Sequence, residues 1–214
     1  NSTPFRIAIN GYGRIGQCVL RALYENGYRD HLQVVAINEL SDIDTIAHLT
    51  KYDSTHGRFH GEVAVDGDNL VVNGDRIRVL RHPDPSDLPW RLLDVDLVLE
   101  CSGAYSDRAT AEKHIEAGAQ RLLFSQPGES DVDRTVVFGI NDHQLNAEDV
   151  IVAAGSCTTN CLVPVIKVLD DAFGVEQGST TTIHAAMNDQ PVIDAYHHQD
   201  LRRTRSALHN IVPV

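Results

Sequence analysis

The chain has 214 residues, 42% of them hydrophobic and 22% charged, and a net charge of −12. This composition indicates a water-soluble globular protein of one or two domains, and the acidic balance argues against a nucleic-acid-binding surface. No apolar run approaches the roughly 18 residues that a membrane span requires, and residues 1–6 lack a signal-peptide core, so we expect no membrane partner. The four cysteines show neither disulfide nor zinc-site spacing, which favours a reduced, cytoplasmic setting and predicts no metal site.

The N-terminal segment carries a nucleotide-binding pattern. Residues 5–10 read as a short apolar strand, and the sequence GYGRIG at 11–16 leads from it into a helical pattern. In such a turn Gly11 reverses the chain, Gly13 lets the backbone approach a pyrophosphate, and Gly16 allows close helix–strand packing. The pyrophosphate would bind at the helix N-terminus. We therefore predict cofactor contacts at Gly11, Gly13, Arg14, Ile15 and Gly16.

The next strand ends in an acidic residue at a position that selects the cofactor. Residues 33–38 form a second apolar strand, and Glu39 closes it. In a dinucleotide-binding βαβ unit, an acid at this place bonds the ribose 2′-hydroxyl and repels a 2′-phosphate, which favours NAD over NADP. The alternative is a solvated acid at a strand end. We also include Ser125, at the end of a later strand, in the predicted cofactor site.

The middle of the chain predicts a parallel sheet with an antiparallel insertion. Residues 41–56 look like a helix and a loop, and residues 61–81 alternate between apolar and polar positions, with turns at Gly67 and Gly74. The alternation of strand and helix then resumes, with a helix at 108–118 and strands at 96–101, 121–125, 135–138 and 150–154. Strands separated by helices predict an α/β fold with a doubly wound (Rossmann) parallel sheet.

A second motif begins where the last of these strands ends. Residues 150–154 are apolar, Gly155 and Ser156 form a tight turn, and helical periodicity follows from Cys157. This arrangement places the Cys157 thiol at a helix N-terminus, where backbone N–H groups and the helix dipole favour a thiolate. A thiolate with a histidine in reach is a covalent nucleophile with its base, and His184 follows 27 positions later. The alternatives are a cysteine packed as a small hydrophobe and a strand histidine bonded to backbone or water.

The change of domain should fall near Cys157, where the first sheet is complete. We predict a Rossmann NAD-binding domain over 1–156, followed by the start of an α+β catalytic domain over 157–214. The second part is short for a domain that also carries a catalytic pocket, so we expect it to be truncated.

Four segments together resemble the phosphorylating aldehyde dehydrogenases of the glyceraldehyde-3-phosphate dehydrogenase family: residues 10–16, 52–59, 156–161 and 182–184. The resemblance implies an NAD-dependent oxidoreductase that acts on the aldehyde of a small sugar phosphate, as a homotetramer. It also implies that Cys157 is the nucleophile and His184 the general base. Similarity to the bacterial D-erythrose-4-phosphate dehydrogenases exceeds similarity to the glycolytic enzymes in residues 37–40, 186–197 and 200–207.

One difference from the glycolytic pattern bears on how the substrate phosphate is bound. Glycolytic members usually have a threonine three residues after the base, where it helps to hold the substrate phosphate, whereas this chain has Met187. A four-carbon sugar phosphate carries its phosphate farther from the aldehyde, which is consistent with loss of that hydroxyl. The resemblance then implies oxidation of D-erythrose 4-phosphate to 4-phosphoerythronate through a Cys157 thioester, in the pyridoxine pathway to pyridoxal phosphate. Two alternatives stay open: a phosphorylating glyceraldehyde-3-phosphate dehydrogenase of glycolysis, and a non-catalytic NAD-binding module.

Three further residues are candidates for substrate binding. Ser156 and Thr158 flank the predicted nucleophile. Arg202 carries a guanidinium fork suited to phosphate, although the resemblance also places its loop between subunits near the cofactor. Cys161, one helical turn after Cys157, is expected to be packed.

Overall fold

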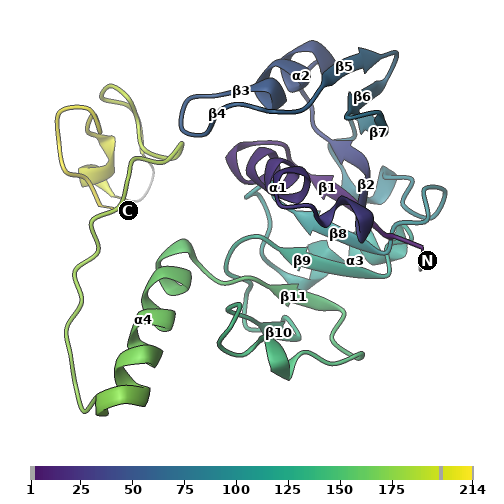
Figure 1. The fold of residues 1–214 in the computed structure, drawn as a ribbon. Coiled ribbons are helices and arrows are strands. Elements are labelled where there is room, and N and C mark those ends of the chain that lie inside the picture. Colours follow the sequence, from purple (N-terminus) through teal and green to yellow (C-terminus); the bar gives the residue numbers. More distant parts are fainter. Residues whose placement is uncertain (1–2, 198–199, 214) are drawn as a thin grey trace. The chain divides into compact units, whose positions relative to one another are not determined.

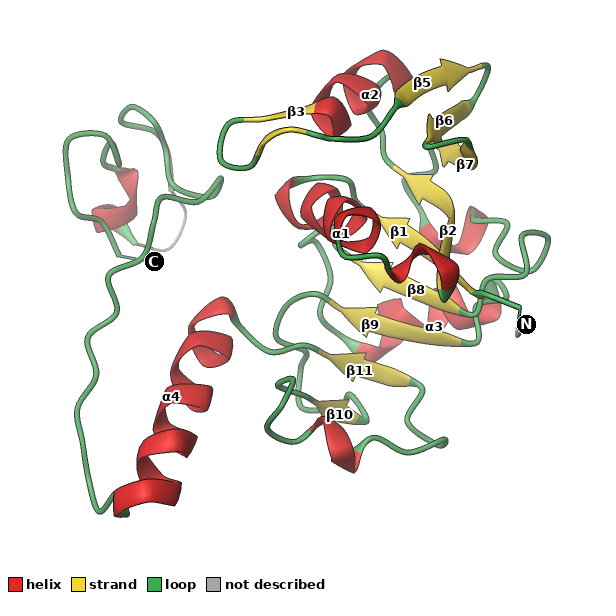
Figure 2. Ribbon diagram, in the orientation of Figure 1, coloured by secondary structure: helices red, strands yellow, loops and turns green. Residues whose placement is uncertain are grey.

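The computed structural model describes residues 3–197 and 200–213. It divides into two compact units, residues 1–172 and 173–214. Figure 1 traces the chain and labels its elements, and Figure 2 distinguishes the helices from the strands. None of the helices in the described residues has the length and apolar character that a bilayer crossing requires.

Nine strands of the described residues form one sheet in the first unit, in the order β10-β11-β9-β8-β1-β2-β7-β6-β5. The pairs from β10 to β7 are parallel, and β7, β6 and β5 pair antiparallel. The predicted Rossmann sheet with an antiparallel insertion is therefore confirmed. The strands are β1 (Phe5–Asn10), β2 (Leu32–Asn38), β5 (Val63–Asp66), β6 (Asn69–Val72), β7 (Asp75–Leu80), β8 (Leu97–Glu100), β9 (Arg121–Phe124), β10 (Arg134–Thr135) and β11 (Ile151–Ala153).

The other elements of the described chain are helices, one hairpin and short 3-10 turns. The helices are α1 (Arg14–Glu25), α2 (Ile43–Lys51), α3 (Arg108–Glu116) and α4 (Cys157–Phe173). The hairpin joins β3 (Tyr52–Asp53) to β4 (Gly57–Arg58) in a separate two-stranded sheet. The 3-10 turns are Tyr28–Asp30, Pro85–Asp87, Asp142–Gln144 and Leu201–Thr204.

The two faces of the sheet have separate cores. Ile7 and Ile9 of β1 join one buried cluster, to which α1 contributes Leu20. Ala8, between them, joins a second cluster, to which α3 contributes Ala111. The alternation follows from the strand itself, in which successive side chains point to opposite faces. Each fully buried leucine or isoleucine stabilises the fold by about 1.5–3 kcal/mol. The two clusters therefore stabilise the sheet, whose strand ends carry the candidate site.

One predicted strand differs from the structure. The strand expected at 135–138 is only β10 at the edge of the sheet, because the Val137 N–H donates to the Asn141 side-chain oxygen (2.7 Å) and leaves the ladder. The antiparallel insertion is joined directly to the parallel sheet. Its last strand, β7, pairs in parallel with β2, so the insertion extends the same sheet.

The helix that begins at Cys157 contributes little to these cores. None of the residues of α4 is buried. Cys161 is exposed, so the expectation that it would be packed is wrong. Val165, Ile166 and Val168, which gave the helix its apolar periodicity, are also exposed, because no element of the first unit covers that face.

The second unit has little regular structure in its described part. Residues 174–187 form neither helix nor strand, which removes the strand that one alternative for His184 assumed. Farther along, the chain folds back on itself. The Ala195 N–H donates to the Thr204 carbonyl and the Ala207 N–H to the Pro191 carbonyl, both at 2.9 Å.

Candidate active site and cofactor pocket

The glycine turn between β1 and α1 has the geometry that its sequence predicts. Gly11 has a φ of +89°, and a Cβ there would lie 2.4 Å from the Ser102 backbone. A Cβ at Gly16 would lie 2.4 Å from the Gly11 carbonyl oxygen. By contrast, no atom lies within 4 Å of a Cβ built on Gly13. Two glycines are therefore required by close packing, and the third leaves its backbone open to a ligand.

The N-terminus of α1 is suited to an anion. Gly13 is its N-cap and offers no side chain to the first-turn N–H groups. Such N–H groups, together with the helix dipole, bind phosphate. Arg14 and Ile15 begin the helix, and the Ile15 side chain is exposed. These backbone groups fit a pyrophosphate, which supports the NAD contacts expected here.

The Arg14 side chain has a structural partner. Its guanidinium pairs with the Asp53 carboxylate, which also accepts the N–H groups of Thr55 and His56 at 2.8 Å each. The bond from Arg14, followed by that of the His56 N–H, holds the pKa of Asp53 well below its usual value. The side chain of Arg14 thus ties α1 to the loop between β3 and β4. Only its backbone is left at the expected pyrophosphate position.

A pocket of about 310 Å³ opens beside the glycine turn, at the carboxyl ends of the parallel strands. Dinucleotides bind at this edge of doubly wound sheets. Gly11, Gly13 and Glu39 of the predicted cofactor site line it. One oxygen of Glu39 accepts the Tyr12 N–H, and the other accepts the Leu40 N–H, both at 2.8 Å. The carboxylate is therefore held at the pocket edge, and its bond to a ribose stays a prediction.

Ser125 lies at the same end of the sheet, directly after β9. Its N–H donates to the Glu100 carbonyl at 3.0 Å. It is not among the described residues that line this pocket. Neighbouring Cys101 does line the pocket, and burial raises the pKa of its thiol to about 11. Cys101 is therefore a packed thiol and not a second nucleophile.

Three polar residues at or directly beneath the pocket were missed in the sequence. Asn38, Asn10 and Glu100 end the strands β2, β1 and β8, and the sheet register pairs Asn10 with both of the others. All three are buried. The available signal was a polar residue at the end of each apolar strand. It could not be interpreted without the strand order, which brings the three ends together.

Cys157 occupies the position expected of a nucleophile at a helix start. Gly155, with a φ of +73°, turns the chain after β11. The Ser156 hydroxyl accepts the Thr159 N–H at 3.0 Å and so caps α4. Cys157 is the first residue of that helix, and its side chain is exposed. Ser156, predicted to bind substrate, therefore serves as the cap, and Thr158 is half-buried in the first turn.

His184 and Arg202 belong to the second unit. The His184 Nδ1 atom lies 2.6 Å from the Ala185 carbonyl oxygen, which can only accept, so Nδ1 carries the proton of the neutral ring. The acceptor function of that ring then falls on Nε2. Arg202 is exposed and pairs with Asp200, whose pKa it lowers to about 2. The roles of His184 as base and of Arg202 toward substrate stay predictions.

Comparison with known families identifies both parts of the chain. Residues 5–108 match the family described as glyceraldehyde 3-phosphate dehydrogenase, NAD binding domain. Residues 156–214 match glyceraldehyde 3-phosphate dehydrogenase, C-terminal domain. The chain therefore belongs to the glyceraldehyde-3-phosphate dehydrogenase family. It is an oxidoreductase that acts on an aldehyde group with NAD, which sets aside the non-catalytic module.

Proposed function

We propose that this member of the family oxidises D-erythrose 4-phosphate to 4-phosphoerythronate, in the pathway to pyridoxal phosphate. The observation that carries the chemistry is the exposed thiol of Cys157 at the capped N-terminus of α4. The choice of substrate is supported by the sequence of residues 186–197 and 200–207. It is also supported by Met187, which has no hydroxyl where glycolytic members hold the phosphate.

Cys157 and His184 divide the chemistry. The Cys157 thiolate attacks the aldehyde carbon, and protonated His184 donates its proton to the aldehyde oxygen, which gives a thiohemiacetal. His184 then takes the hydroxyl proton as the carbon gives up its hydride, leaving a thioester on the sulfur. NAD, when bound, supplies the hydride acceptor. Water adds to the thioester carbon, and the carbon–sulfur bond breaks to release the acid and restore the thiolate.

The residues of the glycine turn bind and orient the cofactor in this proposal. The backbone at Gly13 and the first N–H groups of α1 hold the pyrophosphate, and Glu39 accepts from a ribose hydroxyl. Ser156 and Thr158 lie next to the nucleophile, where a hydroxyl can contact the substrate. Arg202 is a further candidate for the substrate phosphate, since a guanidinium fork matches phosphate oxygens.

We also propose a division into an NAD-binding domain over 1–156 and the first part of a catalytic domain from 157. The match to the C-terminal domain, which begins at residue 156, supports this boundary. A cytoplasmic homotetramer belongs to the same proposal, and the family resemblance alone supports it. Size measurement of the full-length protein in solution tests the tetramer.

Oxidation of glyceraldehyde 3-phosphate is the second candidate, because both matched families carry that substrate in their description. NADH formation by the full-length protein, with each aldehyde and with or without inorganic phosphate, separates the two. The proposal predicts a higher kcat/KM for erythrose 4-phosphate and no need for phosphate. A preference for the triose that depends strictly on phosphate would overturn it.

A substitution sharpens the same test. Met187→Thr places a hydroxyl where glycolytic members have one, so kcat/KM for the triose should rise relative to erythrose 4-phosphate. An unchanged ratio would mean that Met187 does not set the substrate.

A further inference from the structure

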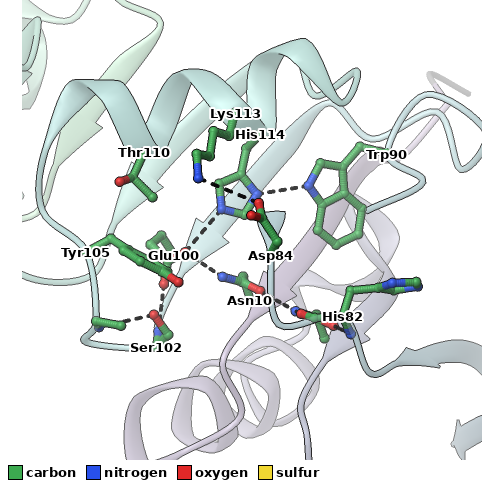
Figure 3. Close-up of polar contacts among 12 residues, drawn as sticks. Asn10, His82, Asp84, Trp90, Glu100, Ser102, Tyr105, Thr110, Lys113 and His114 are labelled. Carbon is green, nitrogen blue, oxygen red and sulfur yellow. Dashed lines mark hydrogen bonds and ion pairs between the residues drawn. The ribbon is translucent and has the colours of Figure 1, made fainter. Parts of the chain in front are cut away.

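A line of buried hydrogen bonds crosses the floor of the pocket, as Figure 3 shows in part. The Asn38 side-chain N–H donates to Asn10 Oδ1 at 2.7 Å, and the Asn10 side-chain N–H donates to Glu100 Oε2 at 2.5 Å. The three side chains are neighbours because their strands end side by side in the sheet. They link β2, β1 and β8 at the edge where the cofactor is expected.

The two ends of this line hold the two walls of the pocket. On one wall, Asn38 Oδ1 accepts the His82 N–H and its Nδ2 donates to the His82 carbonyl, both at 2.9 Å. On the other wall, Glu100 Oε1 accepts the Ser102 N–H at 2.8 Å. His82 and Ser102 both line the pocket. The distance between the walls therefore depends on an unbroken line of bonds from His82 to Ser102.

The polarity of the line requires one carboxylate. At one end His82 presents its N–H and its carbonyl, which together fix the Asn38 amide with Oδ1 accepting and Nδ2 donating. At the other end the Ser102 N–H can only donate, so the side chains between have to accept at each end. An amide accepts a hydrogen bond through its oxygen and donates one through its nitrogen. In a row of amides, all the hydrogen bonds therefore run in the same direction from donor to acceptor. One member has to accept on both sides, and of the amide and acid side chains only a carboxylate does so. If position 100 carried an amide, two donors would face each other somewhere along the line, whichever way the amides turned.

His114 lies against this carboxylate, and Trp90 holds His114. The Trp90 indole N–H donates to His114 Nδ1 at 3.0 Å, so the proton of the neutral imidazole is on Nε2. Nε2 lies 3.3 Å from Glu100 Oε2, a long contact that makes no hydrogen bond of good geometry. All three side chains are at most 1% exposed.

Burial alone would raise the pKa of Glu100, but its contacts with His114, Ser102 and Asn10 outweigh burial and lower that pKa. An ionised carboxylate in a core costs several kcal/mol when its partners are imperfect. The neutral amide would therefore be the simpler choice if packing were the only role of this position.

We infer that Glu100 is a positioning residue for the dinucleotide, because its carboxylate closes the line of hydrogen bonds that sets the two walls of the pocket. This inference rests on the proposed assignment of the pocket to NAD. Glu100 does not line the pocket itself and acts through Asn10, Asn38 and the backbone at Ser102.

The test is the dissociation constant for NAD, measured by calorimetry on the full-length protein at a temperature where every variant is folded. Glu100→Gln should weaken binding by about tenfold, the equivalent of one lost charge-assisted hydrogen bond. The double variant Asn10→Asp with Glu100→Gln moves the carboxylate to position 10 and again gives one acceptor facing both ways. It should recover most of the lost affinity. Asn10→Asp alone sets two carboxylates against each other and should also weaken binding.

Recovery of NAD affinity in the double variant distinguishes a positioning role of Glu100 from a merely structural one, provided that NAD affinity and thermal stability are both measured for every variant. Ile46→Val, in the core cluster on the other face, should lower thermal stability and leave NAD affinity unchanged. Trp90 is the single tryptophan of the chain, so its fluorescence reports whether the surroundings of Glu100 stay native. Unchanged NAD affinity in Glu100→Gln, or a double variant no better than Glu100→Gln, would overturn the inference.

A separate variant tests the assignment of the pocket. Gly13→Ala adds a methyl group into open space, at a backbone conformation with a φ of −77° that alanine accepts. It should leave the fold intact and weaken NAD binding. If Gly13→Ala weakens binding and Glu100→Gln does not, the pocket assignment stands and the positioning role fails. If neither changes the affinity, the pocket assignment fails and the inference fails with it.

Discussion

The cofactor pocket and the reaction motif are built in different ways. The pocket lies where buried strands end, and hydrogen bonds among Asn10, Asn38 and Glu100 fix its edges. Cys157 is instead exposed at the start of a helix with no buried residue, and the Ser156 cap fixes its place. A cap of this kind contributes about 1 kcal/mol, far less than a core cluster. If the pocket binds NAD and Cys157 is the nucleophile, as proposed, binding depends on the core and reactivity on local geometry, and mutations should separate the two.

Cys157→Ser should have the largest effect on turnover while leaving NAD binding intact. A hydroxyl is a far weaker nucleophile than a thiolate at neutral pH, so turnover should be lost. NAD affinity should not change, because the pocket does not contain this side chain. NADH formation and calorimetry measure the two properties. Cys161→Ser, one turn along the same exposed helix, is the matched control and should stay active. An active Cys157→Ser enzyme would refute the assigned nucleophile.

His184→Asn should have the next largest effect. Loss of a general base slows a reaction by about 10²–10⁴-fold, and kcat should carry the loss. The exposed His143 provides the control, since His143→Asn removes a ring outside the predicted site. Equal rates for wild type and His184→Asn at all pH values would show that another group accepts the proton.

Glu39→Gln should have the opposite effect to the two previous substitutions. It should change cofactor binding and leave the reactivity of Cys157 unchanged. Loss of the carboxylate removes the repulsion of a 2′-phosphate, so the preference for NAD over NADP should fall by about tenfold. Alkylation of Cys157 by iodoacetamide should proceed at the wild-type rate. Glu25→Gln, at the end of α1, controls for the loss of one negative charge. An unaltered preference between the cofactors would leave Glu39 as a strand-end acid.

The smallest effect should come from Asp53→Asn, which removes the tie between α1 and its neighbouring loop. The pKa of Asp53 is lower in the folded state, so its contacts stabilise the protein above the unfolded pKa of about 4 and are lost as pH falls below it. Because Arg14 is partly exposed, we expect a loss of about 1 kcal/mol at pH 7 and a smaller one at pH 3.

Urea unfolding at the two pH values measures this difference. The control is Asp66→Asn, which breaks the exposed pair with Arg76 and should cost little at either pH. If Asp53→Asn lowered the free energy of unfolding more at pH 3 than at pH 7, the result would contradict this prediction.

The same contrast explains what the sequence could predict. Gly11 and Gly16 were predictable because their requirement is local: a positive φ at one and a close helix–strand approach at the other. The start of α4 at Cys157 was predictable for the same reason, although its Ser156 cap was not predicted. The role of Glu100 was not predictable, because the hydrogen bonds of its line join residues 28 and 90 positions apart in the sequence, which meet only in the folded sheet.

Tertiary contacts also explain the two places where the structure differs from the sequence prediction. Cys161 has the spacing of a packed helix residue, but its packing depends on what covers α4, and no element of the first unit does so. The strand expected at 135–138 ended early because Asn141, a residue outside the strand, took the Val137 N–H. Neither outcome could follow from periodicity alone.

The central claim, an acyl group carried by Cys157, is tested most directly by mass spectrometry of the full-length protein. The protein is mixed with erythrose 4-phosphate and NAD, quenched in acid and digested. The account predicts a phosphoerythronyl thioester on the peptide that contains Cys157, and no adduct at Cys18, Cys101 or Cys161. NADH formation without an adduct on Cys157, or with the adduct at another cysteine, would contradict it.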